Sequence, residues 1–168
     1  IVTLILPTAP ETVYLFYAIN RIGAVATALD PRLKAAEYSK RIADLGSKFI
    51  FATDICMSAL SAIGHFPGKT LVHVSPFESC PPAKLLMPSK SGDFSMSWRQ
   101  FIRKGEIFSE YIDTAYVPDA AAAIVYTGGT TGIPKGVVLT NENFNAMALT
   151  QEISGFNLAA SDSFLTFL

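Results

Sequence analysis

The residues Tyr126 to Thr140 read YTGGTTGIPKGVVLT and combine four glycines, four threonines and one lysine. Glycine adopts backbone conformations that other residues avoid, so consecutive N–H groups can point at one anion. Threonine hydroxyls add hydrogen-bond donors and can bind a metal ion, and a lysine ammonium is suited to phosphate. The segment therefore predicts a phosphate site, whereas its structural alternative is a Gly/Thr hairpin loop with a solvated lysine.

The spacing excludes a Walker-type phosphate loop, in which lysine followed by serine or threonine opens a helix. Lys135 lies instead between Pro134 and Gly136, and a β-branched run follows. We therefore expect the loop to join two strands and to hold phosphate with backbone groups and hydroxyls. A second segment, GHFPGKT at Gly64–Thr70, ends like a Walker motif but has one residue too few between its glycines. We interpret that segment as a helix-to-strand turn.

The loop must be positioned by short apolar runs that alternate with helical segments. The expected strands are Val2–Leu6, Val25–Leu29, Lys48–Ala52, Lys69–Val74, Ala121–Tyr126 and Gly136–Leu139. The expected helices are Pro10–Ile22, Lys34–Leu45, Asp54–Ile63, Ser97–Arg103 and one from a cap at Thr140 or Asn141 to about Ile153. Continuous apolar strands with intervening helices are typical of parallel sheets covered on both faces. The sequence thus predicts an α/β fold, a largely parallel sheet flanked by helices, forming a single α/β subdomain at residues 1–168.

The helices differ in the faces they are expected to bury. Pro10–Ile22 is apolar on nearly every side, which predicts burial on more than one side. Lys34–Leu45 is amphipathic, with its apolar side chains on one stripe, and Gly46 is expected to end it. Trp98 is expected to anchor the short helix Ser97–Arg103. Other aromatic residues are expected in the core, namely Tyr14, Phe16, Tyr17 and Tyr38.

We expect the histidines, cysteines and Asp54 outside the loop to have structural and not catalytic roles. His65 and His73 lack the spacing of metal ligands, and we expect them at surface or edge positions. Asp54 is expected to cap a helix. Cys56 lies in an apolar helix and is expected to be buried, and Cys80 has no neighbouring base to activate it. We therefore predict no metal site and no catalytic residue within this chain.

Composition limits the classes of function. Half of the 168 residues are apolar, 16% are charged, and the formal net charge is -1. This composition is typical of a globular protein, and it provides no basic surplus for nucleic acid. We expect no transmembrane segment and no signal peptide, and the two cysteines indicate reduced thiols in a cytoplasmic protein. Both ends of the chain lie in apolar runs, so we expect a fragment of a longer protein.

The string YTGGTTGIPKGVVLT closely resembles the phosphate-binding signature of the adenylate-forming (AMP-binding) superfamily, which contains acyl-CoA synthetases, peptide-synthetase adenylation domains and luciferases. The segment LPTAPETVYLFYAINRIGAVATALDPRLKAAEY resembles one near the start of their large domain. Gly128, where many relatives carry serine or threonine, resembles a fatty-acyl-CoA ligase variant, and Asn141 stands where many carry histidine. The resemblance implies that the chain is part of the N-terminal AMP-binding domain.

The resemblance also implies a function for the loop at residues 126–136, which would hold the β- and γ-phosphates of ATP. The implied contacts are Thr127, Gly128, Gly129, Thr130, Thr131, Gly132 and Lys135. The reaction would join a carboxylic acid, expected to be a fatty acid, to AMP and pass it to coenzyme A, with Mg²⁺ as cofactor. The family's magnesium-binding glutamate and catalytic lysine are not in this sequence, so we expect the isolated chain to be inactive. Adenylation for a carrier protein and a non-catalytic nucleotide-binding module are the alternatives, and dimerisation is left open.

Overall fold

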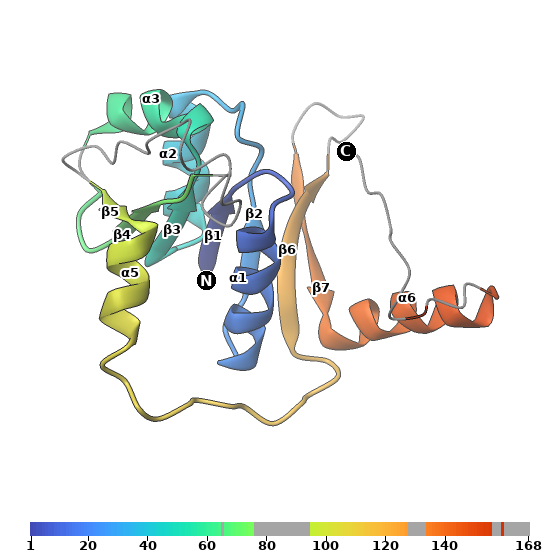
Figure 1. Ribbon diagram of the computed structural model, residues 1–168. Helices are drawn as coiled ribbons and strands as arrows, with labels where there is room; N and C mark the ends of the chain where they lie inside the picture. Colours follow the sequence, from blue (N-terminus) through green and yellow to red (C-terminus); the bar gives the residue numbers. More distant parts are fainter. Residues whose placement is uncertain (65, 76–94, 128–133, 156–158, 160–168) are drawn as a thin grey trace.

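The computed structural model describes residues 1–64, 66–75, 95–127, 134–155 and 159. These residues form a seven-stranded sheet with helices on both faces (Figure 1). The strands are β1 (Val2–Ile5), β2 (Ala26–Ala28), β3 (Phe49–Ala52), β4 (Thr70–His73), β5 (Met96–Ser97), β6 (Ala121–Thr127) and β7 (Lys135–Thr140). The helices are α1 (Pro10–Arg21), α2 (Ala35–Asp44), α3 (Asp54–Ile63), α5 (Trp98–Gly105) and α6 (Asn141–Ile153). The predicted α/β fold is confirmed, and only the two-residue strand β5 was not expected.

The strand order β5-β4-β3-β1-β2-β6-β7 shows how the sheet is wound. All neighbouring strands from β5 to β6 are parallel, and only the last pair, β6 and β7, is antiparallel. Strand β1 lies between β2 and β3, so the chain builds the sheet outward in both directions from β1. Because parallel strands share their direction, the carboxyl ends of β1, β2, β3, β4 and β6 lie at one edge of the sheet.

Each face of the sheet has its own apolar core. On one face, Tyr38 and Ile42 of α2 pack with Cys56 and Leu60 of α3. On the other face, Leu15 and Ile19 of α1 pack with strand residues, and Trp98 and Phe101 of α5 lie against the same cluster. The alternation of side chains along each strand explains the two cores, because successive residues point to opposite faces. Trp98 therefore anchors its helix, as expected, and Cys56 is buried, as expected.

Helix α1 is less buried than its composition predicts. Only Glu11, Leu15 and Ile19 of this helix are buried, whereas Tyr14 and Tyr17 are 62% and 68% exposed. The expectations that α1 is buried on several sides and that these two tyrosines are core residues are therefore wrong. The physical reason is that α1 buries one i, i+4, i+8 stripe, and Tyr14 and Tyr17 lie off that stripe.

Two expectations about polar residues are also corrected. His73 is only 1% exposed, because β4 lies between β3 and β5 and is not an edge strand. Its Nε2 atom forms a hydrogen bond with the carboxylate of Asp54. The N-cap of α3 is Thr53 rather than Asp54, which occupies the first turn. His65, Cys80 and the loop that contains Cys80 lie outside the described residues.

Candidate functional site

The predicted phosphate loop begins and ends in an antiparallel hairpin. Strand β6 enters it and β7 leaves it, with Tyr126 opposite Gly136 and Thr127 opposite Lys135. The hydroxyl of Thr127 lies 3.5 Å from the carbonyl oxygen of Lys135, at the limit of a hydrogen bond. The expectation that this loop joins two strands is confirmed. It follows that Thr127 and Lys135 are held as neighbours by the hydrogen bonds of the hairpin.

The structure describes two of the predicted phosphate contacts. Thr127 and Lys135 are both exposed and lie at the loop end of the hairpin. The remaining predicted contacts lie outside the described residues, namely Gly128, Gly129, Thr130, Thr131 and Gly132. The backbone pairing thus places a lysine and a threonine opposite each other on neighbouring strands, and an ammonium and a hydroxyl can both contact an anion.

The hairpin lies at the edge of the sheet where ligands of α/β proteins bind. Strand β6 is parallel to β2, with Ala28 paired to Val125, so β6 ends beside the carboxyl end of β2. Ligands of open α/β sheets bind outside the carboxyl ends of the strands, near the point where the strand order reverses. In this sheet the order reverses at β1, which lies between β2 and β3. The position of Thr127 is therefore consistent with a ligand site.

A surface hollow of about 690 Å³ lies at the same edge, over the ends of β1 and β2. Its lining is mostly apolar and consists of Leu6, Pro7, Thr8, Ala28, Leu29, Asp30, Pro31, Arg32 and Ile55. The charged groups of the hollow are those of Asp30 and Arg32. Sequence reasoning missed this pair, although the tripeptide Asp30-Pro31-Arg32, placed directly after a strand, was the available signal.

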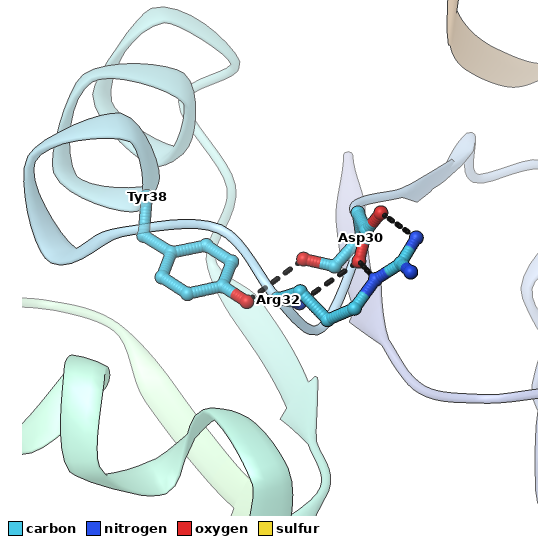
Figure 2. A network of polar contacts seen from close by, with 3 residues as sticks. All are labelled: Asp30, Arg32 and Tyr38. Atoms are coloured by element: carbon cyan, nitrogen blue, oxygen red, sulfur yellow. Dashed lines mark hydrogen bonds and ion pairs between the residues drawn. The ribbon is translucent and has the colours of Figure 1, made fainter.

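Asp30 and Arg32 form a tight ion pair, as Figure 2 shows. The Arg32 side chain donates from Nε at 2.9 Å and from Nη2 at 2.7 Å, and the Arg32 backbone N–H donates at 2.8 Å. These hydrogen bonds lower the pKa of Asp30 to about 2. The carboxylate is therefore ionised at neutral pH, and Arg32 neutralises it. The three hydrogen bonds stabilise the turn after β2.

The described residues of the Walker-like segment, Gly64 and residues 66–70, connect α3 to β4 through a turn, as expected. Gly64 ends α3, Gly68 has a positive φ of 67°, and β4 begins at Thr70. The ammonium of Lys69 donates a hydrogen bond of 2.8 Å to the carbonyl oxygen of Ser47. Lys69 therefore stabilises the backbone that leads into β3.

Metal-binding clusters and membrane-spanning helices are both absent from the described residues. They contain no group of three or more histidine, cysteine, aspartate or glutamate side chains arranged to hold a metal ion. Within the same part of the chain, every helix is too short or too polar to span a membrane.

Comparisons with known proteins identify a family and agree with the fold. Residues 1–168 match the protein family described as AMP-binding enzyme. The chain is 30% identical over 158 residues to 4-coumarate–CoA ligase 1 of Arabidopsis thaliana, covering 94% of this chain and 26% of the relative. It is 28% identical to 4-coumarate–CoA ligase 2 of Solanum tuberosum, covering 93% and 26%. The chain thus spans about a quarter of the length of the curated relatives it matches.

Solved structures show the same fold. A long-chain-fatty-acid-CoA ligase (FadD1) from Archaeoglobus fulgidus superposes with a TM-score of 0.69 at 23% identity, over 96% of this chain and 29% of that one. ATP-bound MatB from Rhodopseudomonas palustris superposes with a TM-score of 0.65 at 23% identity, over 89% and 26%. At this identity the likeness concerns the fold alone.

Proposed function

The chain belongs to the AMP-binding enzyme family, and we propose that it is the N-terminal part of an ATP-dependent carboxylate–CoA ligase whose loop at residues 126–136 holds the phosphates of ATP. In the first half-reaction, a carboxylate oxygen attacks the α-phosphorus of ATP, and pyrophosphate leaves. In the second, the thiol of coenzyme A attacks the acyl carbon, and AMP leaves. In this proposal, the present chain binds the pyrophosphate that leaves.

The observation that carries the proposal is the pairing of Thr127 with Lys135 at the carboxyl edge of the sheet. A lysine ammonium forms charge-assisted hydrogen bonds with phosphate, which are stronger than neutral ones. The hairpin places this lysine directly opposite the threonine on the neighbouring strand. We propose the backbone N–H groups of Gly128, Gly129 and Gly132, with Thr130 and Thr131, as the further contacts. Mg²⁺ is proposed as a partner of the nucleotide, and the described residues contain no group of three or more histidine, cysteine, aspartate or glutamate side chains that could hold it.

Two substrate classes are proposed. Gly128 resembles the fatty-acyl-CoA ligase variant of the loop and favours a fatty acid. The sequence relatives named 4-coumarate–CoA ligase favour a hydroxycinnamic acid as the second candidate. As an alternative to coenzyme A, the acyl group is passed to the thiol of a carrier protein. A cytoplasmic location is also proposed.

Pyrophosphate exchange tests the proposal directly. The protein that carries this chain is incubated with ATP, labelled pyrophosphate, Mg²⁺ and either palmitate or 4-coumarate. We expect exchange that depends on one of the acids, and thioester formation when coenzyme A is added. The isolated 168-residue chain is the control, and we expect it to give no exchange. Nucleotide binding without exchange for any acid would support the non-catalytic module instead, and transfer only to a carrier-protein thiol would support the carrier alternative.

A further inference from the structure

Tyr126 connects the loop hairpin to helix α2. The guanidinium carbon of Arg41 lies 4.7 Å from the centroid of the Tyr126 ring. The ring is partly buried against the core that contains Tyr38 and Ile42 of α2. A guanidinium over an aromatic face is attracted by the negative face of the ring. Arg41 therefore holds a side chain that directly precedes Thr127.

The opposite strand approaches the same ring closely. Tyr126 is paired with Gly136, and a Cβ atom added to Gly136 would lie 3.6 Å from Cε1 of Tyr126 and 3.2 Å from Cγ2 of Ile124. Because Gly136 has no side chain, the side chains of Ile124 and Tyr126 can occupy the space beside it. Fixing the ring of Tyr126 consequently restrains Gly136 and, with it, the adjacent Lys135.

Arg41 is itself held in place by helix α2. Its side chain is 15% exposed, and one of its guanidinium nitrogens lies 4.0 Å from the carboxylate of Glu37, one helical turn earlier. Glu37 also accepts a hydrogen bond of 3.2 Å from the backbone N–H of Lys34, at the start of the helix. Arginine can stack on a ring while it pairs with a carboxylate, because its charge is delocalised over a planar group. Lysine has a compact charge and can replace this arrangement only in part.

We propose that Arg41 is a positioning residue for the phosphate site, acting through Tyr126 on the strand ends that carry Thr127 and Lys135. This inference rests on the proposed function of the loop. Arg41 does not contact the nucleotide in this account. Its contribution is to keep the threonine hydroxyl and the lysine ammonium at the spacing set by the hairpin, and it therefore affects ATP and not the carboxylic acid.

The test uses the intact protein that carries this chain and steady-state kinetics in which ATP and acid are varied separately. Arg41→Met keeps most of the apolar stem and removes the charge over the ring. We expect the KM for ATP to rise about three- to tenfold, in line with the strength of partly buried cation–π contacts, while the KM for the acid stays unchanged. Arg41→Lys should recover part of the loss. Lys40→Met is the matched control, because it removes the same charge from an exposed position of α2, and its KM for ATP should not change.

A double-mutant cycle with Tyr126→Leu tests the route of the effect. If Arg41 acts through the ring, Arg41→Met adds nothing further to the loss caused by Tyr126→Leu. Fully additive losses, or a KM for ATP of Arg41→Met equal to that of Lys40→Met, would overturn the inference and leave the proposed function intact. If the wild-type protein shows no ATP-dependent exchange at all, both the proposed function and this inference are wrong. Thermal unfolding shows whether each variant folds. If Arg41→Met does not fold, Arg41→Lys takes its place in the comparison of the KM for ATP.

Discussion

The hydroxyl of Tyr38 donates a hydrogen bond of 2.8 Å to the backbone carbonyl oxygen of Asp30, which joins α2 to the segment after β2 (Figure 2). The Tyr38 side chain is fully buried in the core under α2 and α3. It thus combines apolar burial with a partner for a backbone group beside the surface hollow. Burial raises the pKa of Tyr38 well above its ordinary value.

We expect Tyr38→Phe to lower the free energy of unfolding by about 1 kcal/mol, because the ring remains packed while the hydrogen bond is lost. Tyr14→Phe is the control, since Tyr14 is 62% exposed, and its effect should stay within about 0.5 kcal/mol. Urea unfolding followed by circular dichroism measures both. Equal effects in the two variants would contradict the role assigned to the hydrogen bond.

The ion pair of Asp30 and Arg32 predicts a pH effect with a defined sign. The pKa of Asp30 is lowered to about 2 by the hydrogen bonds from Arg32. A lowered pKa contributes stability that is fully present above the ordinary aspartate pKa and is lost as the pH falls toward 2. Arg32→Gln should raise the pKa of Asp30 toward its ordinary range. Carbonyl-detected NMR titration measures this, and an Asp30 pKa that stays near 2 in the variant would show that Arg32 is not the cause.

Burial raises the pKa of the Cys56 thiol to about 11. We therefore expect the thiol to remain neutral and unmodified by iodoacetamide at pH 8 in the folded protein, and to react in urea. A raised pKa contributes stability that is present below the ordinary thiol pKa and is lost as the pH rises through about 11. The experiment uses Cys80→Ser, so that a single cysteine remains. Rapid alkylation of the native variant would mean that Cys56 is accessible.

Replacing two glycines by alanine is expected to change the stability of the fold in opposite directions. Gly23 has a φ of 70°, and a Cβ atom there would lie 3.1 Å from Cγ2 of Thr114. Gly23→Ala should therefore destabilise the fold by more than about 1 kcal/mol. Gly105, the last residue of α5, has no atom within 4 Å of an added Cβ, and Gly105→Ala should be neutral or stabilising by up to about 1 kcal/mol. Thermal unfolding compares the two, and equal shifts in Tm would refute the argument.

Lys135→Ala tests the proposed phosphate contact in the intact protein. A hydrogen bond to a charged group contributes about 1.5–3 kcal/mol, so kcat/KM for ATP should fall roughly tenfold to a hundredfold or more. The KM for the carboxylic acid should change little. Lys69→Ala is the control, because Lys69 is bound to the carbonyl oxygen of Ser47. An unchanged kcat/KM for ATP in Lys135→Ala would exclude a phosphate role for this lysine.

Much of the local structure follows from the sequence. The β-branched residues after Lys135 correctly predict a strand, and therefore a loop between two strands. The cap predicted at Thr140 or Asn141 is Thr140, whose hydroxyl accepts a hydrogen bond from the backbone N–H of Asn143. Gly46, expected to end the helix at residues 35–44, follows it with a φ of 61°. These features depend on residues close in the chain, and short-range sequence patterns are sufficient to indicate them.

The tertiary structure alone decided which segments became neighbours. Pairing of β2 with β6 places Asp30 and Thr127 at one edge of the sheet, although many residues separate them. His73 is buried because β5, a strand too short to predict, covers β4 on its outer side. Arg41 belongs to an amphipathic helix whose periodicity gives no partner for this charge, yet its guanidinium lies over the ring of Tyr126. Periodicity specifies which face of an element is apolar, but the partner of that face, or of a single charge, depends on how crossovers order the strands.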